Sequence, residues 1–247
     1  TPFGMVNSPA SLQALLNDIF KDYLELFIII YLDDLLIFSL NAADHAKHLQ
    51  VVADVLRKHN LRLSLKKCSF YQDKVNFLGH TVGKDGIGMD PSKVKAVQDW
   101  PVLTSVKEVK QFIGLASYYR RFIMHFADLA HPLTHLTRKD VGWRWNLQEH
   151  NAFTSLKQAM TQAPVLAIVD PHKGFTLHTD ASDFALGGVL SQEQPDGTLR
   201  PVAFQSRKLK PAEMNYATHE KELLAIVHSL IVWRHYCTGR PISVATD

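Results

Sequence analysis

The chain has 247 residues, enough for one large domain or two small ones. Hydrophobic residues make up 46% and charged residues 21%, a composition that excludes an intrinsically disordered chain. The formal net charge of +3 is too weakly basic to establish a nucleic-acid partner by itself.

Neither a membrane segment nor a disulfide framework is predicted. The longest apolar run, residues 26–32, is much shorter than the roughly 18–20 residues that a span requires, and no secretory leader opens the chain. Cys68 and Cys237 lie far apart and form no C-x-x-C pair, so they fit a reducing compartment. The histidines show no zinc-ligand spacing.

The first third of the chain alternates between helical and strand patterns. Ser8-Pro9 predicts a helix start, and the apolar runs 26–32 and 35–38, separated only by Asp33-Asp34, predict a β-hairpin. Further predicted elements are a helix over 44–59, strands over 61–66 and 75–82, and a turn at 83–86.

The middle of the chain is predicted to be helical and the end to return to strands. Asp90-Pro91 begins one helix, and Ser105/Glu108 and Asn146/Glu149 are capping boxes that begin two more. A linker is predicted between Leu129 and Trp143. The later elements are strands over 175–180, 187–191, 200–206 and 242–247, and a long helix that includes 223–230.

Asp33 and Asp34 form an unusual spacer for a hairpin. Favoured two-residue turns contain glycine, and adjacent carboxylates repel each other. A divalent cation such as Mg²⁺ would relieve that repulsion. A solvated turn is the alternative interpretation, because aspartate is a common turn residue.

Three further acids are predicted to meet at one sheet edge. Asp180 and Asp247 each follow a threonine at the end of a strand, and Glu222 lies in the first turn of the long helix. If the two strands are neighbours, the three carboxylates form a site for two divalent ions of the kind that cleaves phosphodiesters. Taken singly, each acid also has a structural interpretation as a helix cap, a first-turn acid or a surface residue.

These motifs resemble the polymerase polyprotein of gypsy-type LTR retrotransposons and, more distantly, of retroviruses. Tyr31-Leu32-Asp33-Asp34 is similar to the reverse transcriptase Y-x-D-D box. The other matching segments are residues 1–10, Phe77-Leu78-Gly79-His80, residues 118–123, residues 179–182 and residues 220–226. This ordered set covers nearly the whole chain and is far more specific than Y-x-D-D alone.

The resemblance implies an α+β fold with three parts. It implies a partial reverse transcriptase palm at 1–86, a helical thumb or connection at 87–140, and a truncated ribonuclease H-like α/β domain at 141–247. In the family pattern, the first polymerase aspartate and the fingers precede Thr1, and a fourth ribonuclease H acid follows Asp247. We therefore expect the 247-residue chain alone to polymerise little or no DNA, with the rest of the polyprotein upstream and downstream.

The resemblance also implies roles for individual residues. Asp33 and Asp34 would hold Mg²⁺ or Mn²⁺ for nucleotidyl transfer, and Asp180, Glu222 and Asp247 would hold it for cutting RNA in an RNA–DNA hybrid. Glu220 competes with Glu222, which we prefer because it directly precedes the Leu-Leu-Ala-Ile run, as the family's acid does. The residues implied in nucleic-acid binding are Tyr31, Phe77, Leu78, Gly79, His80, Tyr118, Arg120 and Arg121.

The implied partners are an RNA–DNA hybrid, a template-primer and, in the complete enzyme, deoxynucleotide triphosphates; no membrane partner is implied. A hypothesis from another class is a non-catalytic nucleic-acid-binding remnant of a retroelement. A stand-alone ribonuclease is a third, which the thumb-like segment disfavours.

Overall fold

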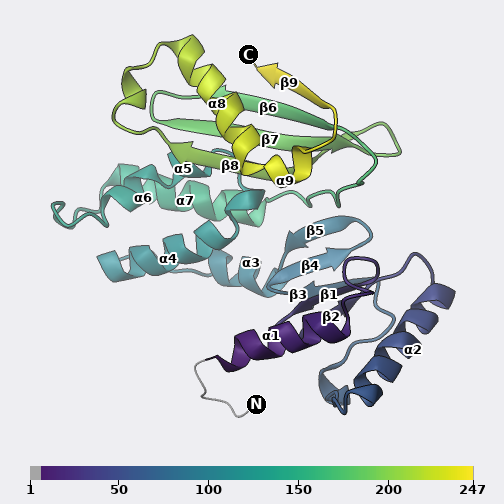
Figure 1. Cartoon of the computed structure of the whole chain (residues 1–247). Helices are drawn as coiled ribbons and strands as arrows, with labels where there is room; N and C mark the ends of the chain where they lie inside the picture. The colour runs from purple at the N-terminus through teal and green to yellow at the C-terminus, as the bar shows by residue number, and fades with distance from the viewer. Residues whose placement is uncertain (1–6, 247) are drawn as a thin grey trace. The chain divides into compact units, whose positions relative to one another are not determined.

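A computed structural model describes residues 7–246 and divides into two compact units, the first ending at Leu78 and the second starting at Gly79 (Figure 1). Both combine helices with β-sheet, in agreement with the predicted α+β class. In the part of the chain that the structure describes, no helix combines the length and apolar character needed to cross a bilayer.

The first unit is built around a two-stranded antiparallel sheet. Its elements are α1 (Ser8–Ile19), β1 (Ile28–Tyr31), β2 (Asp34–Ile37), α2 (Ala42–Lys58), the 3₁₀ turn η1 (Leu65–Lys67) and β3 (Lys74–Phe77). Apolar faces of α1 and α2 bury against β1 in one core, formed by Leu16, Phe20, Phe27, Ile28, Val52 and Leu56. The predicted hairpin is thus present. The helix predicted to start at Ser8-Pro9 is α1, and the helix predicted over 44–59 is α2.

Two strand predictions in this region differ from the structure: the strand over 61–66 is absent, and the strand over 75–82 is interrupted. Residues 61–66 form no strand; they run as irregular chain into η1, and Leu63 and Leu65 are exposed. Alternation alone cannot make a strand, because the backbone also needs a hydrogen-bonding neighbour. The strand predicted over 75–82 is broken by positive φ angles of 49° at Leu78 and 69° at Gly79.

The second unit starts with a hairpin and a helical layer. Its elements are β4 (His80–Gly83), β5 (Gly86–Met89), α3 (Pro91–Gln98), α4 (Val106–Tyr118), the 3₁₀ turn η2 (Arg120–Phe122), α5 (Phe126–Leu129), α6 (His131–His135) and α7 (Leu147–Thr161). The predicted turn at 83–86 joins β4 to β5, with Gly83 opposite Gly86. The helices share a core that includes Phe112, Phe122, Leu133 and Leu156.

The predicted helix starts in this layer are confirmed by their caps. Asp90 accepts a hydrogen bond from the amide of Ser92 at 2.8 Å, and Asn146 and Glu149 form a complete capping box. Ser105 accepts from the amide of Glu108 at 3.3 Å, but the Glu108 carboxylate accepts from the amide of Thr104. In this box the glutamate therefore bonds the amide of the residue before the N-cap and not the amide of the N-cap itself.

A four-stranded mixed sheet completes the second unit. Its elements are β6 (Phe175–Ala181), β7 (Ala185–Glu193), β8 (Leu199–Lys208), the 3₁₀ turn η3 (Glu213–Asn215), α8 (Thr218–Val232), α9 (Arg234–Cys237) and β9 (Ile242–Thr246). The strand order is β8-β7-β6-β9, and β9 pairs parallel to β6. α8 crosses one face of this sheet (Figure 1) and packs against β6 and β7. The sequence predictions of the first three strands and of the long helix are confirmed, and the strand predicted over 242–247 is confirmed as far as Thr246.

Candidate active sites

The aspartate pair lies at the turn between β1 and β2. Tyr31 pairs with Asp34, so the two turn residues are Leu32 and Asp33 rather than the two aspartates. Leu32 takes the left-handed conformation, with φ at 54°, which costs a non-glycine residue about 1–2 kcal/mol. Both aspartates and Tyr31 are exposed, so the two carboxylates project from a turn into solvent.

A glutamine that the sequence analysis assigned no role holds this turn. The Gln13 side chain, on α1, accepts a hydrogen bond from the amide of Leu32 at 2.5 Å and donates to the carbonyl of Ile30 at 3.4 Å. It also donates to Asn17 at 2.8 Å, one turn further along α1. The only sequence signal was a polar residue placed between Leu12 and Leu16, on the side of α1 that packs on the hairpin.

The second candidate site lies where β6 and β9 end side by side. The parallel register places Thr179 opposite Thr246, so Asp180 is the next residue along β6. Asp247 lies outside the described residues. The adjacency of the two Thr-Asp strands, which the predicted metal site required, is therefore present up to Thr246.

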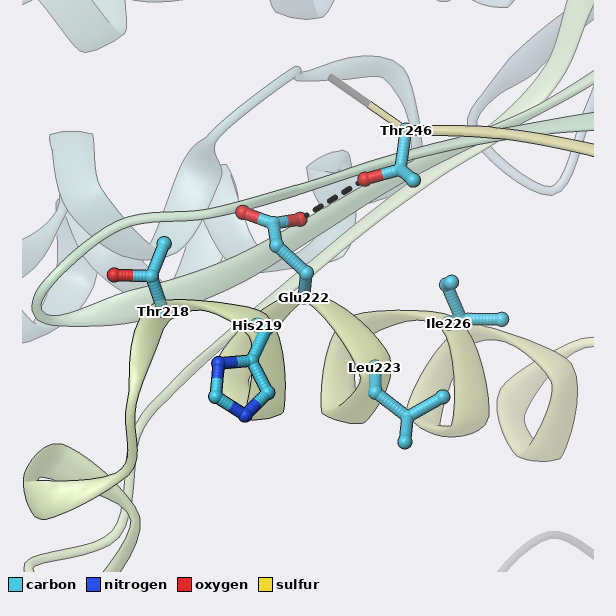
Figure 2. A pocket seen from close by; sticks show the side chains of 6 residues that line it. All are labelled: Thr218, His219, Glu222, Leu223, Ile226 and Thr246. Atoms are coloured by element: carbon cyan, nitrogen blue, oxygen red, sulfur yellow. Dashed lines mark hydrogen bonds between the residues drawn. The ribbon is translucent and has the colours of Figure 1, made fainter.

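Glu222 reaches this strand end from α8. Its carboxylate accepts a hydrogen bond from the Thr246 hydroxyl at 3.2 Å (Figure 2). Around it lies an open hollow of about 550 Å³, lined by Thr218, His219, Glu222, Leu223, Ile226 and Thr246. Glu220 instead accepts from the amide of Ala217 at 2.9 Å and so caps the helix. The geometry favours Glu222 over Glu220 as the site acid.

Asp180 has a different neighbour. It pairs with Gly187, and a Cβ atom on Gly187 would lie 3.3 Å from the His125 ring, whereas one on Gly188 would meet Ser229 of α8. Because paired residues share a face, Asp180 leaves the sheet on the face opposite α8. Its carboxylate lies 3.9 Å from His125 Nδ1, and the side chain is 53% exposed.

The described residues thus give the acids separate neighbours and do not gather them in one cluster. Glu222 contacts Thr246, Asp180 faces His125, and Asp33 adjoins Asp34. Within residues 7–246 no three His, Cys, Asp or Glu side chains are placed to share a metal ion. The donors present are carboxylates, which are the hard oxygen ligands that Mg²⁺ and Mn²⁺ take.

The residues predicted to contact nucleic acid around Gly79 and Tyr118 form an aromatic cluster in the second unit. The His80 ring stacks on Tyr118, with centroids 5.3 Å apart, and Tyr119 donates its hydroxyl to the carbonyl of Gly79 at 2.6 Å. Burial, then the neighbouring Tyr118, raises the pKa of Tyr119 to about 12. Tyr118 is half exposed, so it is the member available to a ligand. Phe77 and Leu78 belong to the first unit.

The two arginines that follow this cluster, Arg120 and Arg121, make different contacts. Arg120 donates to the carbonyl of Ser206 on β8, and its guanidinium lies 5.6 Å from the Phe126 ring centroid. That side chain is engaged inside the unit. Arg121 lies over the Phe122 ring at 5.9 Å, and its Nε is buried without a hydrogen-bond partner. Arg120 is nevertheless an exposed residue, whereas the buried Nε of Arg121 is closed to solvent and to a ligand.

Comparison with known families gives two matches along the chain. Residues 1–82 match the family model "Reverse transcriptase (RNA-dependent DNA polymerase)", and residues 145–244 match "RNase H-like domain found in reverse transcriptase".

Curated relatives match the whole chain. It is 42% identical over 247 residues to the retrovirus-related Pol polyprotein from transposon 297 of Drosophila melanogaster, and 38% identical over 248 residues to the transposon Tf2-3 polyprotein of Schizosaccharomyces pombe. The matches cover all of this chain but only 23% and 19% of those relatives.

Solved structures match at the level of the fold and at 25% sequence identity. A foamy viral protease–reverse transcriptase dRH in complex with double-stranded DNA has a TM-score of 0.88, and a foamy viral protease–reverse transcriptase in complex with an RNA/DNA hybrid has 0.84. Each covers 99% of this chain, and the chain covers 43% and 33% of those proteins.

Proposed function

We propose that this chain, which belongs to the reverse transcriptase and RNase H family of LTR-retrotransposon Pol polyproteins, contributes to two metal-dependent reactions on nucleic acid. One is RNA-directed DNA synthesis at Asp33 and Asp34. The other is cleavage of the RNA strand of a hybrid at Asp180, Glu222 and Asp247. The observation that supports the proposal is the parallel pairing of β6 with β9, which places Thr179, the residue before Asp180, opposite Thr246, the residue that Glu222 contacts.

At the polymerase site, the chain contributes two neighbouring carboxylates, Asp33 and Asp34, at a turn that Gln13 restrains. Asp33 occupies the turn and Asp34 begins β2, while Gln13 fixes the amide that precedes them. This restraint keeps both acids at one end of the hairpin, where they would hold Mg²⁺ or Mn²⁺. The metal, when bound, would neutralise the charge on the phosphates of the incoming nucleotide. The proposed substrates are deoxynucleotide triphosphates and a template-primer.

At the ribonuclease site, the protein would orient acids from a strand and a helix. Glu222 is fixed by Thr246, and Asp180 is fixed by its position on the central strand β6. Asp247 would follow Thr246 along β9. Divalent metal, when bound, would stabilise the attacking and leaving oxygens of the phosphodiester.

Nucleic acid is the proposed partner at the aromatic cluster as well. The foamy viral proteins similar to this chain are in complex with double-stranded DNA and with an RNA/DNA hybrid. Tyr118 is half exposed beside His80, and Arg120 is exposed, so these residues can contact a sugar–phosphate backbone. Contacts of this type read the shape of the hybrid rather than its sequence.

The test is a pair of activities measured in a polyprotein segment that includes this chain and its flanking Pol sequence. Asp33→Asn should abolish primer extension and spare hybrid cleavage, and Asp180→Asn should do the reverse. Asp54→Asn and Asp196→Asn are matched controls, because both are exposed acids that we assign to neither site. Retention of cleavage in Asp180→Asn would overturn the ribonuclease assignment. A wild-type segment that binds hybrid but catalyses neither reaction would establish the binding-remnant alternative.

A further inference from the structure

A group of basic side chains lies beside the loop that follows Asp180. His131, His135 and Arg138 come from α6 and the turn after it, and Lys208 ends β8. Lys208 donates to the Thr134 hydroxyl at 2.6 Å, which fixes its ammonium group against α6. Together with Phe184, these four residues are named here the basic patch.

In the described part of the chain, the permanent charges of the basic patch, Lys208 and Arg138, have no ion-pair partner, and Asp128 is the carboxylate that acts on Lys208 and His131. Within residues 7–246, none of the four forms an ion pair with a carboxylate. Burial first, and then the charge of Arg138, lower the pKa of Lys208, and only Asp128 opposes this. Burial likewise lowers the pKa of His131, followed by Lys208, His135 and Arg138. Like charges held this close favour an anion from outside the chain.

Two further features of the basic patch indicate a ligand. The Nδ1 atom of His131 is buried without a hydrogen-bond partner, which is an uncommon state for a polar atom. The Phe184 ring, 6.2 Å from the His131 ring between centroids, is 59% exposed at the turn between β6 and β7. Cations beside an exposed aromatic ring are the combination that holds a nucleic-acid strand, with phosphates on the charges and a sugar or base on the ring.

The basic patch is joined to the proposed ribonuclease site through one loop. Phe184 lies four residues after Asp180, and the Ser182 hydroxyl between them donates to the Asp128 carboxylate at 3.1 Å. This bond ties the loop after β6 to α5, the helix that precedes α6. A strand bound near Asp180 therefore has cations and an aromatic ring next to its path.

We propose that the basic patch binds the sugar–phosphate backbone of the nucleic-acid strand that enters the ribonuclease site. The proposal rests on the proposed function, since it names a substrate contact for that site. The patch holds and aligns the strand, and its residues take no part in the chemical step. It is separate from the Tyr118 cluster, which contains none of its residues.

The experiment measures binding of an RNA–DNA hybrid, in EDTA and over a range of salt concentrations, to the polyprotein segment described above. Arg138→Gln should weaken binding about fivefold near 0.15 M salt and reduce the salt slope by about one, because it removes one phosphate contact. Phe184→Ala should weaken binding by a similar factor with an unchanged slope, because its contact carries no charge. Arg138 is exposed and forms no ion pair within residues 7–246, so folding should be unaffected.

Arg234→Gln is the matched control. Arg234 is an exposed arginine on α9, next to Tyr236, whose ring contacts Phe175 at the start of β6, the strand end away from Asp180. Equal affinities and salt slopes for Arg138→Gln and Arg234→Gln would overturn the proposal. Asp180→Asn separates the two claims: it should bind the hybrid normally in EDTA and fail to cleave it when Mg²⁺ is added. If it still cleaves, the nuclease assignment fails while the binding result at the basic patch stands.

Discussion

Replacing Gln13 with methionine tests whether this side chain holds the aspartate turn. Methionine keeps the length and helix preference of glutamine but cannot accept from the amide of Leu32 or donate to the carbonyl of Ile30. A partly buried amide left without its partner costs about 1–3 kcal/mol. Since 1.4 kcal/mol is a factor of ten, exchange of the Leu32 amide proton should accelerate roughly 5- to 150-fold.

Amide hydrogen exchange measured by NMR is the assay, because it reports opening at one amide rather than unfolding of the whole chain. Gln50→Met is the matched control: Gln50 is exposed on α2 and its side chain donates to the exposed Asp54, so Leu32 exchange should not change. The reasoning is refuted if Gln13→Met leaves Leu32 exchange unchanged, or if Gln50→Met accelerates it equally. In the polyprotein segment, the same Gln13 variant should slow primer extension and spare hybrid cleavage.

Two further predictions concern the second unit. Gly188→Ala would place a Cβ 2.6 Å from Ser229 Oγ, an atom that is hydrogen-bonded to Gln205 and to the carbonyl of Ala225. Urea unfolding should therefore show that the free energy of unfolding falls by about 1–3 kcal/mol. Gly114 lies in α4 with open space around it, so Gly114→Ala should instead raise the free energy of unfolding by about 0.5–1 kcal/mol. Equal stabilities for the two variants would contradict the packing argument. A hydrogen bond from Arg207, which contacts the carboxylate at 2.6 and 3.1 Å, is the main cause that lowers the pKa of Glu213 to about 2. Its stabilising contribution is therefore present above about pH 4.5 and lost as the pH falls toward 2, so Glu213→Gln should flatten the stability curve in that interval; an identical curve for both proteins would count against the pair.

Local signals in the sequence were sufficient for much of the fold. Asp90-Pro91 and Asn146 mark helix starts through bonds to their own first turns, so no distant residue is needed to define them. The hairpin between the apolar runs and the strand character of 175–181 are also local patterns. The order of acids and motifs along the chain was likewise sufficient to identify the family.

Residues 61–66 and the two-residue turn show where local pattern fails. The alternating leucines of 61–66 fit a strand, but a strand exists only if another segment pairs with it. The turn residues shifted to Leu32 and Asp33 because Gln13, some twenty residues away in the sequence, holds the Leu32 amide in a left-handed turn. Neither outcome is encoded within the segment itself.

The candidate sites divide in the same way. The sequence by itself determined which acids are present and that Asp180 lies near the end of a strand. The tertiary structure decided that β6 and β9 are neighbours, that Glu222 reaches Thr246 while Glu220 caps its helix, and that Asp180 faces His125. It also decided that Arg120 donates a hydrogen bond to the Ser206 carbonyl. It brought the four basic side chains of the basic patch together beside Phe184. The physical reason is that pairing, facing and burial depend on which distant segments pack together, whereas caps, turns and periodicity depend on neighbours along the chain.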